Sequence, residues 1–149
     1  MQASEGCLNL IKACEGFRPY PYLCPAGVPT IGYGSTRYAD GRAVKLSDPP
    51  ITEEVAQMIM KATLDDYEAA VSRYVTVELN QHQFDALVDF AYNAGAQNLR
   101  TSTLLKLLNQ RQYEKAAEEF GKWVYGGGKK LGGLIKRRGL ERDLFEQVA

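Results

Sequence analysis

The six prolines of this chain all lie between residues 19 and 50, and they divide the sequence into two parts of different character. Proline lacks a backbone N–H and fixes its own φ, so a segment this rich in proline cannot form a long helix. The segment also contains a β-prone run, Thr30-Ile31-Gly32-Tyr33-Gly34, and an Asp40-Gly41 turn signal. We therefore predict a small antiparallel sheet over residues 17–50.

Helical periodicity replaces this pattern after residue 50. Thr52 can cap a helix, and Glu53 and Glu54 in its first turn suit the positive end of the helix dipole. Its predicted buried stripe consists of Val55, Met58, Ile59 and Ala62.

The remaining helices are indicated by capping residues and glycines. Ser4 can cap a helix before the sheet, and Asn80 with Gln83 resembles the capping pair of a helix that Gly95 can end. Further helices are expected after Ser102, around Ala116, and after the break at Gly126–Gly128. The predicted fold class is thus α+β, with a helix over 4–14, a β lobe over about 17–50, a helical lobe over about 52–147 within one domain of residues 1–149, and a last helix over 134–147.

The length and charge of the chain set broad limits on function. A chain of 149 residues favours one domain, or two lobes sharing a core, over two independent domains. Its 18 basic and 18 acidic side chains balance, which excludes a strongly polybasic nucleic-acid binder. The charges are uneven, however: residues 1–99 carry a net charge of −5 and residues 100–149 carry +5. The basic end, with Lys129, Lys130, Lys136, Arg137 and Arg138, is suited to an anionic polymer or surface, although a solvated face is the ordinary explanation.

Several classes of protein are excluded by absent residues. No run approaches the roughly 18 apolar residues of a membrane span, and the N-terminus lacks a basic-then-apolar signal pattern. His82 is the only histidine, and the three cysteines do not have zinc-type spacing. We therefore expect no metal ion and no cofactor, and we interpret His82 as a structural residue in the capping turn of a helix.

Three residues between positions 15 and 30 could carry chemistry. A carboxyl group in apolar surroundings, as Glu15 is after Ala13 and Cys14, can act as a general acid near neutrality. Each residue also has an ordinary explanation: Glu15 as a solvated helix end, Cys24 as a small buried side chain, and Thr30 as a strand former. Taken singly, none of the three identifies a function.

Their spacing and flanking residues resemble those of the phage-type lysozymes, the endolysin family of glycoside hydrolases. In the first motif, Glu15-Gly16-Phe17-Arg18 is followed by Cys24 and then by Pro29-Thr30-Ile31-Gly32-Tyr33-Gly34. The second motif runs from Leu79 through Asn80-Gln81-His82-Gln83-Phe84 to Gly95, and the third comprises Gly133-Leu134-Ile135-Lys136-Arg137-Arg138 with Glu141 and Leu144. The resemblance therefore covers almost the whole chain.

The resemblance implies a lysozyme-like fold with a cleft between the β lobe and the helical lobe, and with the helix at Met58–Tyr74 joining the two lobes. It further implies hydrolysis of the β-1,4 bond between N-acetylmuramic acid and N-acetylglucosamine in peptidoglycan, which lyses the host cell. Glu15 matches the general acid, Cys24 a position that is Asp or Cys in the family, and Thr30 the threonine that positions the attacking water. Tyr33, Ser35, Thr36 and Arg137 are expected to bind substrate, and Tyr20, Tyr22, Tyr125 and Trp123 could stack on sugar rings.

The cysteine at position 24 leaves the stereochemistry open. An Asp at that position would be ionised at neutral pH, whereas a cysteine thiol has an ordinary pKa of about 8.5. Cys24 must therefore be shifted toward the thiolate or act in a weaker role. The family is expected to invert the anomeric centre, but a thiolate that attacked the sugar directly would form a covalent intermediate.

The three cysteines also suggest regulation by oxidation. If Cys7 and Cys14 share one helix, seven rises of 1.5 Å separate them by roughly 10 Å, which exceeds the roughly 7 Å that a disulfide can span. An internal disulfide would then join Cys24 to Cys7 or to Cys14. Oxidation would silence the enzyme under this hypothesis, and three reduced thiols are the alternative.

Other functions and settings remain open at this stage. Cys24 activated by His82 would make a cysteine hydrolase that cuts peptide cross-links. Alternatively, the basic C-terminal helix could permeabilise membranes while the cleft only binds glycan. For the leading hypothesis we expect a monomer that is made in the host cytoplasm, acts on the periplasmic cell wall, and depends on a holin-type pore by family analogy. A virion-associated role would use the same catalytic domain.

Overall fold

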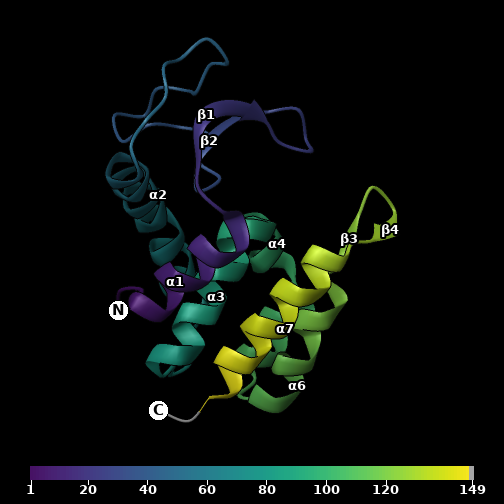
Figure 1. Ribbon diagram of the computed structural model, residues 1–149. Helices are drawn as coiled ribbons and strands as arrows, with labels where there is room; N and C mark the ends of the chain where they lie inside the picture. The colour runs from purple at the N-terminus through teal and green to yellow at the C-terminus, as the bar shows by residue number, and fades with distance from the viewer. Residues whose placement is uncertain (148–149) are drawn as a thin grey trace. The chain divides into compact units, whose positions relative to one another are not determined.

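The computed structural model describes residues 1–147, and its elements confirm the predicted α+β class (Figure 1). The chain forms two compact units, one of residues 11–66 and one of residues 1–10 with 67–147. The main helices and strands are α1 (Glu5–Glu15), β1 (Arg18–Leu23), β2 (Pro29–Gly32), α2 (Glu53–Tyr74), α3 (Gln81–Ala94), α4 (Ala96–Thr101), α5 (Thr103–Asn109), α6 (Tyr113–Glu119), β3 (Tyr125–Gly126), β4 (Lys129–Lys130) and α7 (Gly132–Glu146). A 3-10 turn at Phe120–Lys122 follows α6.

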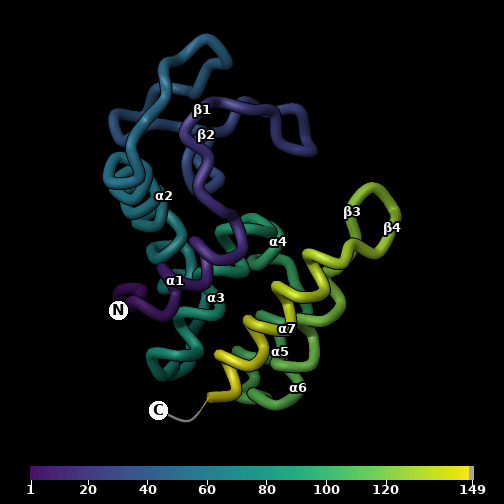
Figure 2. The backbone as a smooth tube through the Cα atoms, in the orientation of Figure 1, coloured from purple at the N-terminus to yellow at the C-terminus, as the bar shows by residue number. Residues whose placement is uncertain are grey.

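The sheet of the first unit is a two-stranded antiparallel ladder of β1 and β2. Tyr22 pairs with Thr30 and Leu23 with Pro29, but the register shifts between Tyr22 and Arg18, which pairs with Gly32. Pro19 and Pro21 lie in this interval. Because proline cannot donate a ladder hydrogen bond, the strand is irregular there. The trace in Figure 2 continues from β2 through an irregular segment to α2.

Helix α2 begins as predicted, but its buried face differs from the predicted stripe. The Thr52 hydroxyl accepts a hydrogen bond from the N–H of Val55 at 3.2 Å. Ile59 is buried, whereas Met58 is 65% exposed and Val55 is 39% exposed, so these two were assigned wrongly. The side chains of this helix that are buried are Ala56, Ile59, Met60, Leu64, Ala70 and Val71.

A close approach of β2 fixes which face of α2 is buried. A Cβ added to Gly32 would lie 3.1 Å from the Cβ of Ala56, so the strand backbone packs directly on the start of the helix. Apolar residues occur on several sides of this helix, and the periodicity alone could not choose among them. The contact at Gly32 makes that choice.

The second unit is helical, and its caps match the sequence. Asn80 and Gln83 form a reciprocal capping box at the start of α3, and Gly95, with φ 103°, ends that helix. The Ser102 hydroxyl caps α5 by accepting from the N–H of Leu105 at 3.0 Å. Edge-to-face aromatic contacts occupy the core of this unit, and they join Phe90 to Phe120, Phe90 to Trp123, and Phe120 to Phe145.

The break at Gly126–Gly128 is a second two-stranded hairpin, which the sequence did not predict. Tyr125 pairs with Lys130, and Gly126 pairs with Lys129. Gly127 and Gly128 have φ values of 59° and 80°, which suit the tight turn that joins two antiparallel strands. The helix that follows begins at Gly132 and ends at Glu146, two residues before the predicted start and one before the predicted end.

Candidate active site

Glu15 is the last residue of α1, as the sequence predicted. The N–H of Gly16 donates to the carbonyl of Lys12 at 3.0 Å, and Gly16 adopts φ 72°, which carries the chain out of the helix. A residue that adopts this left-handed conformation at the end of a helix is usually glycine. Glu15 is half-buried. Its carboxyl group therefore extends from a fixed helix end while keeping part of its surface accessible.

The carboxyl group of Glu15 lies against the backbone of Gly34. A Cβ added to Gly34 would lie 2.6 Å from Oε1 of Glu15 and 3.0 Å from its Cδ. Gly34 has φ 79°, and the turn is closed by paired hydrogen bonds between Ile31 and Ser35 at 2.8 and 2.9 Å. Only glycine satisfies both the φ and the space at this position. The turn after β2 therefore positions the Glu15 carboxyl group.

Cys24 begins the loop that joins β1 to β2. Its N–H donates to the carbonyl of Val28 at 3.0 Å, and its own carbonyl accepts from Gly27 at 2.8 Å. The pKa of the Cys24 thiol is lowered, chiefly because the N–H of Val28 donates to the sulfur. Partial burial acts in the opposite direction and raises this pKa. The N–H of Ala26 and the hydroxyl of Thr30 lower the pKa further. The loop therefore favours the thiolate form of Cys24.

Thr30 is 3% exposed and lies beside Cys24. Its hydroxyl donates to the carbonyl of Val28 at 2.8 Å and also lies within hydrogen-bonding reach of the Cys24 sulfur. Because a hydroxyl has a single proton, it can donate to only one acceptor at a time. Thr30 can thus exchange one partner for the other without moving its backbone.

The pKa of the Tyr22 phenol responds to the charges of two predicted catalytic residues, Glu15 and Cys24. Burial raises the pKa of its phenol most, and the negative charges of Glu15 and Cys24 raise it further. The Arg18 guanidinium opposes this effect, since it lies 3.9 Å from the centre of the Tyr22 ring. The phenol therefore lies within electrostatic range of both Glu15 and Cys24. The sequence indicated Tyr22 only as an aromatic that could stack on sugar, and its pairing with Thr30 was not predicted.

The residues expected to bind substrate have different surroundings. Thr36 is exposed, but Tyr33 and Ser35 are 4% and 2% exposed. The Tyr33 hydroxyl donates to Glu53 at 3.1 Å. Arg137 is 4% exposed and makes a two-point ion pair with Asp89, at 2.7 and 3.0 Å. Tyr33, Ser35 and Arg137 thus present little surface to a ligand, and substrate binding by these residues remains a prediction.

Cys7 and Cys14, the thiols predicted to be regulatory, both lie on α1, as the distance argument assumed. Cys7 is fully buried, and burial raises the pKa of its thiol, with Asp89 and Asp85 adding to the effect. Cys14 is half-buried. Cys7 and Cys24 therefore differ strongly in reactivity, because only the thiolate is nucleophilic.

No set of three or more His, Cys, Asp and Glu side chains within residues 1–147 is arranged to hold a metal ion.

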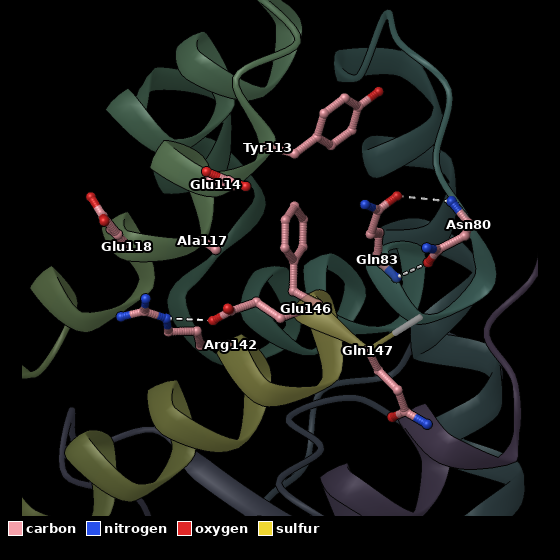
Figure 3. Close-up of a pocket in the computed structure, with 10 residues that line it drawn as sticks. Asn80, Gln83, Tyr113, Glu114, Ala117, Glu118, Arg142, Glu146 and Gln147 are labelled. Carbon is pink, nitrogen blue, oxygen red and sulfur yellow. Dashed lines mark hydrogen bonds and ion pairs between the residues drawn. The ribbon is translucent and has the colours of Figure 1, made fainter. Parts of the chain in front are cut away.

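A cavity of about 700 Å³ in the helical unit contains none of the predicted catalytic residues (Figure 3). Asn80 and Gln83 in its wall bond to each other, and the Nε of Arg142 bonds to Glu146 at 2.6 Å. The cavity is lined by Asn80, Gln83, Tyr113, Glu114, Ala117, Glu118, Arg142, Phe145, Glu146 and Gln147.

Comparison with known proteins identifies the family. The sequence profile described as phage lysozyme matches residues 12–141. The endolysin of Bacillus phage B103 is 41% identical over 97% of this chain, which spans only 54% of that protein's length. The endolysin of Salmonella phage P22 is 39% identical over 97% of this chain and 98% of its own length. An endolysin structure from Escherichia coli O157:H7 phage FAHEc1 has a TM-score of 0.88 at 37% identity, covering 98% of this chain and 94% of that one.

These similarities define a lysozyme fold and an enzyme of the glycoside hydrolase class. The chain belongs to the phage lysozyme family. The resemblance seen in the three sequence motifs is thereby confirmed, and so is the peptidoglycan-hydrolysing type of activity that it implied.

Proposed function

We propose that this chain is a single catalytic domain that hydrolyses the β-1,4 bond between N-acetylmuramic acid and N-acetylglucosamine, with Glu15, Cys24 and Thr30 as its catalytic residues. The observation that carries the proposal is the environment of Cys24. Backbone N–H groups and the Thr30 hydroxyl stabilise its thiolate, so the sulfur can supply the negative charge that an aspartate supplies in other family members. Tyr22 lies within electrostatic range of this sulfur and of Glu15.

The proposed reaction assigns one proton transfer to each of two groups. Glu15 donates its proton to the glycosidic oxygen as the bond from that oxygen to the anomeric carbon breaks. A water, oriented by the Thr30 hydroxyl, adds its oxygen to the anomeric carbon and gives a proton to the Cys24 thiolate. The products are two shorter glycan chains, and a proton passed through solvent from Cys24 to Glu15 restores the enzyme.

We favour attack by water over direct attack by sulfur. Hydrogen bonds that lower the pKa of a thiol also reduce the nucleophilicity of its thiolate. The backbone N–H groups of Val28 and Ala26 donate toward the Cys24 sulfur, and the Thr30 hydroxyl can donate to it in place of the Val28 carbonyl. The product is then expected to have the inverted anomeric configuration, which NMR of freshly released oligosaccharide measures. Release with retained configuration would assign the sulfur as the nucleophile.

Glu15→Gln tests the role of the acid. Removal of a general acid is expected to lower the rate of wall hydrolysis by about two to four orders of magnitude. Glu5→Gln, at the exposed start of the same helix, is the matched control and should keep full activity. The assay counts new reducing sugar ends against new amines. Amines in place of reducing ends would indicate a peptide-cleaving cysteine hydrolase, and full activity of Glu15→Gln would contradict the proposal.

We also propose the biological setting that the resemblance implied. The enzyme is made in the host cytoplasm, works as a monomer on the periplasmic cell wall, and reaches that wall through a holin-type pore. No helix in the described part of the chain is long and apolar enough to span a membrane. Phage relatives that carry the name endolysin support this setting.

Regulation by thiol oxidation is a further part of the proposal. The placement of Cys7 and Cys14 on one helix supports a disulfide that uses Cys24, because a Cys7–Cys14 disulfide would require α1 to unwind. Wall hydrolysis by oxidised protein should rise on addition of a reductant. Equal activity before and after reduction, in protein shown by thiol counting to contain a disulfide, would reject this regulation.

A further inference from the structure

The β3–β4 hairpin and the start of α7 form a surface that combines exposed apolar side chains with lysines. We call it the hairpin surface, and Figure 1 shows its hairpin extending beyond the first turn of α7. Tyr125, Leu131 and Ile135 are 58%, 44% and 49% exposed. Its basic members are Lys129, Lys130 and Lys136, all exposed.

The charge of this surface is entirely positive. The sequence from Gly121 to Lys136 contains four lysines and no Asp or Glu. Lys122 is paired with Glu119 at 2.5 Å, whereas no salt bridge between described residues involves Lys129, Lys130 or Lys136. Arg137 and Arg138, which the sequence placed in the same basic cluster, are 4% and 1% exposed and pair with Asp89 and Glu141. The exposed positive charge therefore belongs to the three lysines.

The hairpin holds these side chains in a fixed arrangement. Tyr125 pairs with Lys130, whose Nζ lies 6.0 Å from the centre of the Tyr125 ring. The N–H of Leu131 donates to the carbonyl of Val124 at 2.9 Å, and its side chain lies against Gly126, where an added Cβ would meet it at 2.5 Å. The N–H of Ile135 donates to the carbonyl of Leu131 at 3.0 Å, so these two side chains are neighbours one helical turn apart.

We infer that the hairpin surface binds the surface of an anionic lipid bilayer. Lysines are attracted to the negative headgroups, and the apolar side chains gain free energy when they leave water at the boundary of the acyl chains. A hydrated anionic polymer such as a nucleic acid would satisfy the lysines but would leave Tyr125, Leu131 and Ile135 in water. The joint presence of apolar and basic groups therefore favours a bilayer. Binding is peripheral, reversible and weakened by salt.

Vesicle sedimentation of the full chain tests this inference. Wild type should sediment with vesicles of phosphatidylglycerol and phosphatidylcholine, but not with phosphatidylcholine alone. Each lysine near an anionic surface contributes about fivefold in affinity, so Lys129→Gln with Lys130→Gln should weaken binding by about 25-fold. Lys106→Gln with Lys115→Gln, at exposed lysines of α5 and α6, changes the net charge equally and should weaken binding less than twofold.

A second pair of variants separates a bilayer from a soluble polyanion. Tyr125→Ser with Ile135→Ser removes apolar surface without changing charge, and it should weaken vesicle binding by at least tenfold. Binding of a single-stranded oligonucleotide should be weaker than vesicle binding and unchanged in this variant. Equal vesicle binding by the Tyr125 and Ile135 variant and by wild type would overturn the inference. So would equal losses in the two lysine pairs, because net charge alone would then explain the binding.

Trp123 provides a direct measure of contact, because it is the only tryptophan and lies two residues before Tyr125. Anionic vesicles with bromine-labelled acyl chains should quench its fluorescence in wild type but not in the Lys129 and Lys130 variant. Absence of quenching in sedimented wild type would contradict insertion of the hairpin surface. Glu15→Gln should bind vesicles as wild type does, which separates this inference from the proposed catalytic roles.

Discussion

The sheet unit and the helical unit hold their charged groups by opposite means. In the sheet unit, Glu15 and Cys24 are half-buried and are positioned by backbone atoms, at Gly34 for the carboxyl group and at Val28 for the sulfur. The helical unit also contains a cluster of four buried charged groups that are positioned by one another: Asp89 with Arg137, and Arg138 with Glu141.

The difference indicates which charged groups can be neutralised or replaced without loss of the fold. A half-buried group that is supported by backbone N–H groups loses little when it becomes neutral, because water can reach what remains. A buried ion pair cannot lose one partner cheaply, because the other charge is then left without compensation in a medium of low polarity. Burial also raises the pKa of Glu141 well above its ordinary range, and Asp89 beside it adds to that effect. Changes in the sheet unit should therefore affect activity, and changes in the helical cluster should affect folding.

The largest expected loss of stability follows from Asp89→Ala. The Arg137 guanidinium would remain buried and would lose its two-point pairing with Asp89, with Glu141 4.0 Å from its Nε, which should lower the free energy of unfolding by about 3–5 kcal/mol in urea titration. Asp40→Ala is the matched control, because Asp40 pairs with Arg42 at 2.7 Å with both side chains exposed. That change should cost less than about 1 kcal/mol. Equal losses in the two variants would mean that burial does not distinguish the two ion pairs.

Gly34→Ala should strongly lower the rate of wall hydrolysis and should lower the free energy of unfolding only modestly. The added Cβ would meet Oε1 of Glu15 at 2.6 Å and displace the carboxyl group, and a displacement of this kind can reduce the rate about 100-fold. The positive φ of Gly34 adds a cost of roughly 1–2 kcal/mol in the free energy of unfolding.

Gly41→Ala provides the matched control for this experiment. Gly41 has φ 90°, so alanine is strained there too, but no atom lies within 4 Å of the added Cβ. The two variants should lose similar stability in urea titration, and only Gly34→Ala should lose wall-hydrolysing activity. Equal activity of the two would indicate that the Gly34 turn does not position Glu15.

The smallest expected effect concerns the pH dependence of Cys24. Its thiolate is the form present above its pKa, and that pKa is lowered, so the proposed role predicts activity that rises with pH through a value below the ordinary thiol range. In Cys24→Asp the rise should disappear, because a carboxylate is already ionised above about pH 4. Rates of wall hydrolysis from pH 5 to 9 measure this. An unchanged rise in Cys24→Asp would assign the titration to another group.

Chemical modification can compare the reactivity of two thiols, Cys7 and Cys24, within one chain. Iodoacetamide should modify Cys24 at a pH where Cys7 stays unmodified, because burial raises the pKa of Cys7 whereas backbone N–H groups lower that of Cys24. Mass spectrometry of the modified peptides identifies the residue. Preferential modification of Cys7 would contradict both assignments.

Local signals in the sequence were sufficient to predict the structure where residues close together in the chain determine it. The capping box of Asn80 and Gln83, the helix end at Gly95 and the Thr52 cap are all present as predicted. Each of these caps depends on residues within four positions of one another, so the local amino-acid sequence is enough to predict it. The prolines likewise limited residues 17–50 to a short, irregular sheet.

Contacts between distant residues were not predictable in this way. Arg137 and Asp89 are 48 positions apart, and their ion pair places in the interior a residue that the sequence assigned to substrate or to a basic surface. Met58 and Val55 were assigned to the buried stripe of α2, and the approach of Gly32 to Ala56 buries a different face.

The family, the α+β class and the order of Glu15, Cys24 and Thr30 could be predicted from the chain's residues alone, because motif spacing and capping chemistry are properties of short segments. Three features emerged only from the folded chain: the Gly34 backbone supports the Glu15 carboxyl group, N–H groups of a loop favour the Cys24 thiolate, and two arginines of the basic end are buried. They could not be predicted because burial and pKa depend on atoms that folding brings together from separate parts of the chain.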